Sequence, residues 1–467
     1  MGNSMGNSMD NSMGNSMGKR VRELTPLEAS FALPWHRPAE ENPLPMNAVL
    51  GVQCILSEAL VARFDSVASM VQQRHPLLRC SIGRGEAPDG EELGPLAIFE
   101  TDTPLKVEVR GAETLKTEAL EGIQAECLNW KDTSPGALLA KIVAIQDASK
   151  PGAWVIYFAL CHAMLDGRSK QIVATEFFAL LGDPEGTLPE MDAATERMTF
   201  AEMLADADVK PADGMGAYFG AYFKARAGLK DAKLTGPSAA IAAQTATMSL
   251  LHGLDATATT AVVKKAKSLG VTVNTLLAYE WTTTVAAHGR FNVPAGVDLT
   301  VGGPMDARSS LGLKYSHTLS NLFGPAGAVL ASGASAEEHM NEISSKYKEI
   351  RAKNWHVAPF SRPKDRDKDK PDRWASAPLE EVCSSFPNSC CGFSNLGRVE
   401  FARAEGLTIE RSWSAGGAYP DVNLICMCVT TAGVCTFSFQ FVTPAHSRAD
   451  AERLVAAFRV RLEALCA

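Results

Sequence analysis

The chain has 467 residues, and its hydrophobic content of 46% is typical of a packed globular protein rather than a disordered one. This length allows two or three domains of ordinary size. The net charge of −8 and an isoelectric point near 5.7 lack the basic excess of nucleic-acid-binding domains, so we expect no nucleic-acid partner.

The N-terminal segment repeats a small polar tetrapeptide, MGNSMGNSMDNSMGNSMG. Because this segment offers almost nothing for a core, we predict a disordered, low-complexity tail over residues 1–20. It lacks the charged start and the apolar stretch of a secretory signal. A myristoylation motif would need Ser or Thr at the position of Gly6, so lipidation is not expected.

Eleven cysteines are distributed from Cys54 to Cys466. None has neighbours at the spacing of zinc ligands, so we expect no metal site. An odd number of cysteines in a chain of this length favours free thiols in a reducing compartment. We therefore expect a cytoplasmic protein.

The first half of the chain, residues 21–181, alternates strand patterns with helical ones. Apolar and β-branched runs predict strands at 47–56, within 74–83, and at 94–100, 104–111, 137–146 and 154–161. Apolar residues three and four apart predict helices over 57–73, with Ser57 as N-cap, over 113–128 and over 171–182. This alternation predicts an α/β domain in which helices cover a sheet.

The second half repeats the α/β pattern after an acidic, proline-bearing segment, residues 182–216, which we interpret as a linker. We predict a second subdomain over residues 217–467. Its expected strands lie at 245–254 and at the start of 297–311, where the strand leads into a loop. Its expected helices lie at 255–270 (stopped by Gly270), 273–289 (capped by Thr272) and 447–467. The mixed charges of residues 361–374 predict a solvated loop.

Residues 422–447 carry no charge, so a membrane span has to be considered. Five polar side chains interrupt the stretch, whereas a spanning helix needs about 20 predominantly apolar residues. The Thr-Ala-Gly sequence at 431–433 predicts a turn between two strand patterns. We therefore predict a β-hairpin and no membrane span.

One histidine directly follows the most apolar strand pattern. Residues 154–170 read WVIYFALCHAMLDGRSK, so His162 is followed by Asp166 and Gly167. Imidazole can take and return a proton near neutral pH, and the glycine would allow close packing or a positive φ. The charge of Asp166 would be costly near a core unless it met a cation, ideally an arginine. These residues alone leave His162 as either a catalytic base or a buried structural histidine.

The His162–Gly167 string resembles the HxxxDG signature of the chloramphenicol-acetyltransferase-like acyltransferases. That superfamily includes condensation domains of peptide synthetases, alcohol and polyketide-associated acyltransferases, and plant acyltransferases. Further stretches resemble the family in the same order: QQRHPLLR (72–79), GALLAKIVAIQ (136–146), GVTVNTLLAYEW (270–281), GGPMDARSSL (302–311), SNLFG (320–324) and FSNLG (393–397). The resemblance covers roughly residues 21–465. The plant signature DFGWG is absent, which favours the alcohol-acyltransferase or polyketide-associated branch.

The resemblance implies two chloramphenicol-acetyltransferase-like subdomains, each a mixed sheet flanked by helices, with a channel between them. It implies that His162, at the middle of the channel, is the general base for direct attack of an acceptor on an acyl thioester. Asp166 and Gly167 would support the site, with Asp166 paired to Arg308; otherwise Arg308 is a solvated surface residue.

Two residues of the FSNLG stretch, Ser394 and Asn395, would line the channel or bind the oxyanion, unless they only shape a turn. His75, before a proline at a helix-to-strand junction, is expected to be structural. We expect a monomeric acyltransferase without a cofactor, using an acyl-CoA co-substrate and a small alcohol or amine. The alternatives are a condensation-type enzyme fed by an acyl carrier protein and a non-catalytic binding protein of the same fold.

Overall fold

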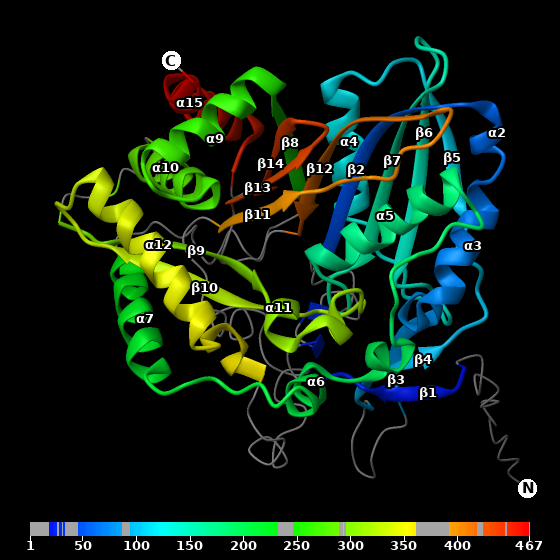
Figure 1. The fold of residues 1–467 in the computed structure, drawn as a ribbon, viewed down its shortest axis with the longest axis horizontal. Coiled ribbons are helices and arrows are strands. Elements are labelled where there is room, and N and C mark those ends of the chain that lie inside the picture. Colours follow the sequence, from blue (N-terminus) through cyan, green and yellow to red (C-terminus); the bar gives the residue numbers. More distant parts are fainter. Residues whose placement is uncertain are drawn as a thin grey trace, which may run out of the picture.

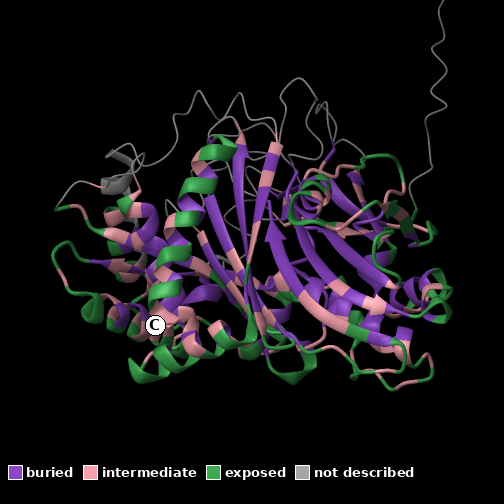
Figure 2. Cartoon of the chain, turned by 90° about the horizontal axis from the view of Figure 1, so that it is seen from above, coloured by how far each residue is buried: buried purple, intermediate pink, exposed green. Residues whose placement is uncertain are grey.

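The computed structural model describes residues 18–25, 28–29, 31–32, 45–85, 94–231, 246–288, 293, 296–360, 392–417, 424–443 and 446–466. They form two large sheets and one small one, with helices packed around them (Figure 1). Most of the tail predicted at 1–20 and the charged loop predicted at 361–374 lie outside the described residues. Figure 2 shows buried strands through the centre of the molecule and exposed residues on the outer helices.

The first large sheet has five strands in the order β12-β2-β7-β6-β5. Their bounds are β12 (Leu407–Gly416), β2 (Asn47–Leu56), β7 (Ala153–Cys161), β6 (Ala140–Asp147) and β5 (Val107–Ala112). All nine residues of β7 are buried, because helices cover both faces of the sheet. This two-sided burial explains why the sequence of β7 is continuously apolar rather than alternating.

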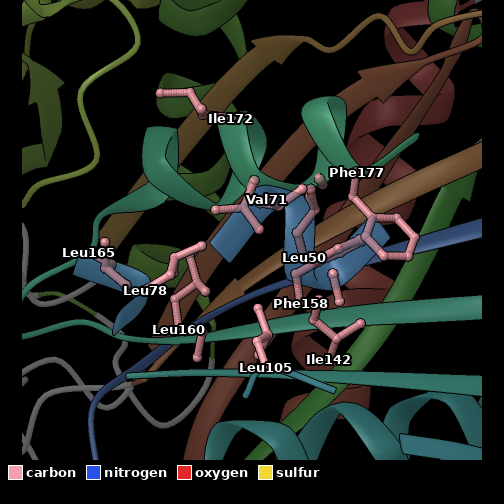
Figure 3. Close-up of a cluster of buried hydrophobic side chains, with 14 of the residues drawn as sticks. Leu50, Val71, Leu78, Leu105, Ile142, Phe158, Leu160, Leu165, Ile172 and Phe177 are labelled. Carbon is pink, nitrogen blue, oxygen red and sulfur yellow. The ribbon is translucent and has the colours of Figure 1, made fainter. Parts of the chain in front are cut away.

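Helices α3 (Phe64–Arg74) and α5 (Gly167–Gly182) pack on one face of this sheet, and α4 (Thr117–Leu128) packs on the other. Phe158 of β7 and Phe177 of α5 meet in the core between the sheet and the first pair of helices (Figure 3). Tyr157, the neighbour of Phe158, points to the opposite face and donates a hydrogen bond to the Leu120 carbonyl of α4. Alternate residues of β7 thus serve two cores.

The second large sheet has six strands in the order β10-β9-β11-β13-β14-β8. Their bounds are β10 (Phe323–Leu330), β9 (Leu299–Asp306), β11 (Gly392–Arg398), β13 (Leu424–Thr431), β14 (Val434–Thr443) and β8 (Ala246–Leu254). Helices α9 (Ala256–Ser268), α10 (Val273–Ala287), α12 (Ala336–Ala352) and α15 (Arg448–Cys466) surround a core that contains Trp281, Phe437 and Phe458. The predicted caps are confirmed: Gly270 has a φ of 69°, and the Thr272 side chain accepts a hydrogen bond from Thr275 N.

Several smaller elements complete the fold. A three-stranded sheet is formed by β1 (Arg20–Glu23), β4 (Leu96–Glu100) and β3 (Cys80–Arg84). Helix α7 (Met215–Asp231) packs on β9 and β10. Strands β13 and β14 form the predicted hairpin, and within the described ranges no helix is long and apolar enough to cross a membrane.

Three sequence predictions require correction in detail. The helix expected over 113–128 begins only at Thr117. The helix expected over 57–73 is broken into α2 (Glu58–Val61) and α3, and the Ser57 side chain makes no capping hydrogen bond. The apolar spacing continues through the break, which is why the sequence predicts one helix. Helix α5 begins at Gly167, four residues earlier than expected.

The division into two halves is also less simple than the sequence predicts. Strand β12, from the second half, pairs antiparallel with β2 and forms an edge of the first sheet. The segment interpreted as a linker contains the 3-10 helix η3 (Ala193–Arg197) and α6 (Phe200–Asp206), and its Glu196 is fully buried. Composition alone favoured a linker, because it could not show that Glu196 has a buried partner.

Candidate active site

His162 lies at the end of β7, where the two halves of the fold meet. Its backbone N–H donates to the Met46 carbonyl at 2.9 Å. Its ring lies between Phe31 (centroid distance 5.3 Å) and Phe323 (5.6 Å), and Phe323 begins β10 of the second sheet. The residue is partly exposed, although every neighbour from Ala163 to Asp166 is buried.

The surroundings of His162 favour the neutral imidazole. Burial and the charge of the nearby Lys170 ammonium together lower the pKa of His162 to about 4, against the opposing charge of Asp166. Among the described residues no other group hydrogen-bonds the buried Nδ1. A neutral imidazole at physiological pH can accept a proton. The ring is positioned by packing between Phe31 and Phe323, and not by a hydrogen bond from Nδ1 to a carboxylate.

Asp166 and Arg308 form a buried ion pair between the two halves. Arg308 Nη1 donates to Asp166 Oδ2 at 2.8 Å, and Arg308 Nη2 donates to Oδ1 at 3.1 Å. Burial alone would raise the pKa of Asp166, but the Arg308 charge and the hydrogen bonds from Arg308, Ser169 N and Leu322 N outweigh it and lower the pKa. Asp166 also caps α5 through Ser169 N at 2.8 Å. Its contacts therefore lead away from the imidazole, and the alternative of a solvated Arg308 is wrong.

The remaining donors of Arg308 hold the segment that leads to β10. They bind Asp306 Oδ1 at 2.8 Å, the Thr318 carbonyl at 3.0 and 3.2 Å, and the Ser320 carbonyl at 3.1 Å. The next residue, Asn321, donates from Nδ2 to the His162 carbonyl at 2.7 Å. Arg308 is thus connected to the backbone of His162 through residues 318–321.

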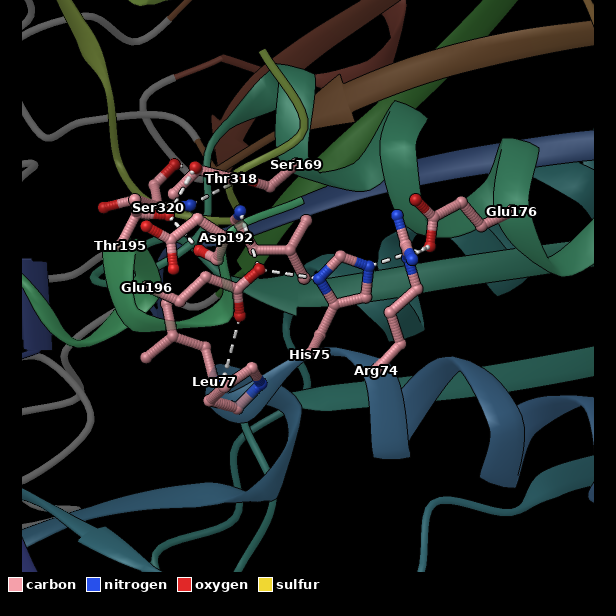
Figure 4. Close-up of polar contacts among 12 residues, drawn as sticks. Arg74, His75, Leu77, Ser169, Glu176, Asp192, Thr195, Glu196, Thr318 and Ser320 are labelled. Atoms are coloured by element: carbon pink, nitrogen blue, oxygen red, sulfur yellow. Dashed lines mark hydrogen bonds and ion pairs between the residues drawn. The ribbon is translucent and has the colours of Figure 1, made fainter. Parts of the chain in front are cut away.

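A second buried cluster, centred on His75, also contacts this segment (Figure 4). His75 Nδ1 lies 2.6 Å from Glu196 Oε1, and His75 Nε2 lies 2.8 Å from Glu176 Oε2. Burial would lower the pKa of His75, but the two carboxylates raise it to about 9. Glu196 Oε1 also accepts from Leu319 N at 3.0 Å, and these ion pairs agree with a structural role for His75.

The other predicted site residues lie close to the start of α5. Gly167 is its first residue, without a positive φ, and an added Cβ would meet only the Leu396 side chain at 3.9 Å. Neither a positive φ nor close packing, the two reasons suggested for a glycine here, therefore accounts for Gly167. Ser394 is buried in β11, and Asn395 Oδ1 accepts from Gly397 N at 2.8 Å, as in a turn. Gln171 of α5 donates to the Leu396 carbonyl at 3.1 Å, so this end of β11 contacts α5.

Sequence reasoning missed part of this arrangement. Phe31 comes from a short segment with no strand or long helical pattern. Lys170 is buried, donates to the Ala415 carbonyl at 2.8 Å, and has its pKa lowered to about 7 by burial. Its position one helical turn after Asp166 could have indicated from the sequence that Lys170 lies near the site. Nowhere in the described residues do three His, Cys, Asp or Glu side chains gather as metal ligands would.

Comparison with known proteins agrees with this arrangement. The structure is similar to the first condensation domain of the calcium-dependent antibiotic synthetase, with a TM-score of 0.66, 14% identity, and coverage of 95% of this chain and 96% of that one. It is similar to polyketide synthase associated protein 5 from Mycobacterium tuberculosis, with a TM-score of 0.63, 13% identity, and coverage of 97% and 99%. The structure is also similar to the condensation domain of the monacolin K polyketide synthase MokA, with a TM-score of 0.63, 10% identity, and coverage of 95% of this chain and 97% of that one.

No protein-family model matches the sequence, and no curated protein matches it either. The structural likeness, at low sequence identity, defines the class of fold. It is the two-subdomain α/β fold of condensation domains, as the sequence resemblance predicted.

Proposed function

We propose that the protein is an acyltransferase that moves an acyl group from an acyl-CoA thioester to a small alcohol or amine. The single observation that carries the proposal is the partly exposed imidazole of His162, packed between Phe31 and Phe323 at the junction of the two halves. Its backbone is fixed from the first half by Met46 and from the second half by Asn321. A base held in this way is prepared to act on a substrate bound between the halves.

In the proposed reaction the acceptor O–H or N–H gives its proton to Nε2 of His162, because Nδ1 is buried. The acceptor oxygen or nitrogen forms a bond to the thioester carbonyl carbon, giving a tetrahedral oxyanion. The C–S bond then breaks, and the proton on His162 passes to the departing thiolate. A positioned proton transfer of this kind typically contributes 10²–10⁴-fold to the rate.

Asp166, Gly167 and Arg308 are proposed to support the site, and Ser394 and Asn395 to line it. The ion pair of Asp166 with Arg308 supports the first assignment, because it joins the two halves beside His162. The contact between β11 and the start of α5 supports the second. The channel between the halves remains a prediction of the resemblance.

The test is release of free thiol from a panel of acyl-CoA thioesters in the presence of alcohol and amine acceptors. We expect His162→Ala to lower turnover by at least a hundredfold while thermal unfolding stays unchanged. His339→Ala is the matched control, because His339 lies on α12 and contacts the Ala331 carbonyl. Turnover by His162→Ala within a few-fold of the parent would contradict the proposal.

The donor has one alternative source, an acyl group on the phosphopantetheine of a carrier protein. Its support is that the similar structures include condensation domains and a cyclization-docking bidomain. Assaying one acyl group on CoA and on an acylated carrier protein separates the two sources. A protein that bound either without transfer would instead be a non-catalytic member of this fold.

A further inference from the structure

Asn321 makes a fixed contact with the residue that carries the proposed base. Its Nδ2 donates to the His162 carbonyl at 2.7 Å, and the side chain is 6% exposed. A carbonyl can only accept hydrogen bonds, so the nitrogen of the carboxamide has to face His162. The carboxamide orientation is therefore determined, and Oδ1 points away from the His162 carbonyl.

The oxygen of the same carboxamide is buried, and among the described residues no group donates a hydrogen bond to it. Buried polar atoms in proteins nearly always have a partner, so such an atom requires an explanation. Asn47, Gln124 and Gln440 also have an unpaired side-chain oxygen in the described structure, but their amide nitrogens donate to the Cys127 carbonyl (Asn47) and to the Ser438 hydroxyl (Gln124 and Gln440). Asn321 differs because its amide nitrogen donates to the backbone carbonyl of His162, the proposed general base.

We propose that Oδ1 of Asn321 accepts a hydrogen bond from the cysteamine N–H of the thioester donor, while Nδ2 holds His162. One side chain would then align the donor with the base. This inference rests on the proposed function and names the part of the donor that the site recognises.

The choice of the cysteamine N–H follows from the chemistry of the transfer. An alcohol acceptor has a single O–H proton, which goes to His162 and leaves nothing to donate to Asn321. The departing sulfur has to approach the imidazole to receive the proton, and the cysteamine N–H lies only two methylenes from that sulfur. CoA and carrier-protein phosphopantetheine share this N–H, so the contact serves either source.

Two small donors test the inference, both carrying the acyl group selected by the CoA panel. One is the N-acetylcysteamine thioester, and the other is the thioester of O-acetyl-2-mercaptoethanol, in which an ester oxygen replaces the N–H. We expect the parent protein to prefer the amide by about tenfold in kcat/KM, the value of one ordinary hydrogen bond. In Asn321→Ala the preference should fall to about one, whatever the absolute rates.

Asn321→Asp separates the two contacts of the side chain. Aspartate keeps an acceptor for the donor N–H but cannot donate to the His162 carbonyl, so we expect it to keep the amide preference while losing activity with both donors. Thermal unfolding shows which variants fold. If Asn321→Ala does not fold, the parent and Asn321→Asp still decide, because equal use of the two donors by both proteins overturns the inference.

Binding of non-reactive thioether analogues of the two donors distinguishes failure of this inference from failure of the proposed function. A tenfold preference for the amide analogue that disappears in Asn321→Ala, without any acyl transfer, supports the contact and contradicts the enzyme. Equal binding of both analogues to the parent overturns the contact even where acyl transfer is established. The comparison of acyl-CoA with acylated carrier protein then identifies which source supplies the N–H.

Discussion

Arg308 binds Asp166 with both of its terminal nitrogens, at 2.8 and 3.1 Å, although 142 residues separate them in the sequence. Both side chains are only 3% exposed, so water competes little for the pair. Asp166 caps α5, and Arg308 also holds the carbonyls of residues 318 and 320. The pair therefore fixes the turn after His162 relative to the second sheet.

We expect Asp166→Ala to lower the free energy of unfolding by about 3–5 kcal/mol, because Arg308 stays buried without its main counter-charge. Urea denaturation followed by tryptophan fluorescence measures the change. Asp306→Asn is the matched control, since Asp306 binds the same guanidinium but is 46% exposed. Asp306→Asn should lower the free energy of unfolding by at most about 1 kcal/mol. Equal losses in the two variants would mean that the buried pair has no special role.

The stability of the protein should depend on pH through His75. Two carboxylates raise its pKa in the folded state to about 9, against 6.5 for the unfolded chain, so the folded state binds the proton more tightly. This contribution, about 3 kcal/mol, is fully present below pH 6.5 and is lost as the pH rises through 9. Denaturation curves between pH 6 and 10 measure it.

His75→Gln should flatten this pH profile, because glutamine keeps a hydrogen-bonding side chain but has no proton to titrate. The stability of the variant should be lower than that of the parent at pH 6, and the difference should shrink toward pH 10. A profile of the same slope in both proteins would assign the pH dependence to other groups.

Much of the fold follows from local sequence patterns. Strands predicted at 47–56 and 154–161 coincide closely with β2 and β7, because strands buried on both faces have continuous apolar sequences. Strand β12 was not predicted, because the adjacent charges of Glu410 and Arg411 interrupt its alternation of apolar and polar residues and its partner β2 lies some 350 residues earlier. No local pattern contains information about a partner at that distance.

Some residues of the candidate site could likewise be predicted from the sequence, and others could not. His162 and Asp166 could be selected because they follow a buried strand, and Arg308 because the stretch GGPMDARSSL resembles the Asp-x-Arg loop of the acyltransferase family. Phe31 and Glu196 could not be selected, since their roles depend on contacts with residues more than a hundred positions away. The sequence gives residue types, whereas these roles are created by packing.

We expect Gly167→Ala to leave the free energy of unfolding unchanged or raise it by up to about 1 kcal/mol, because alanine favours the helical backbone and the nearest atom to its Cβ is 3.9 Å away. Gly303→Ala is the matched control in the second sheet. A Cβ at Gly303 would lie close against the Phe393 carbonyl, so that variant should be destabilised by at least about 2 kcal/mol. If Gly167→Ala were the less stable variant, an unrecognised steric role would exist at the start of α5.

The pH dependence of acyl transfer tests the electrostatics of His162. Burial and the Lys170 ammonium lower its pKa to about 4, so the base stays neutral and kcat/KM should fall only near pH 4 rather than near 6.5.

Lys170→Met removes the cation that opposes the imidazolium, so the pKa of His162 rises and the acid limb of the pH profile should move toward pH 6.5. Lys150→Met is the control, because Lys150 is exposed and paired with Glu410, and it should leave the limb in place. The pKa of Lys170 is itself about 7, so its charge acts on His162 only below that pH, and the two proteins should converge above it. An acid limb near pH 6.5 in the parent would show that the imidazole is more solvated than its packing between Phe31 and Phe323 implies.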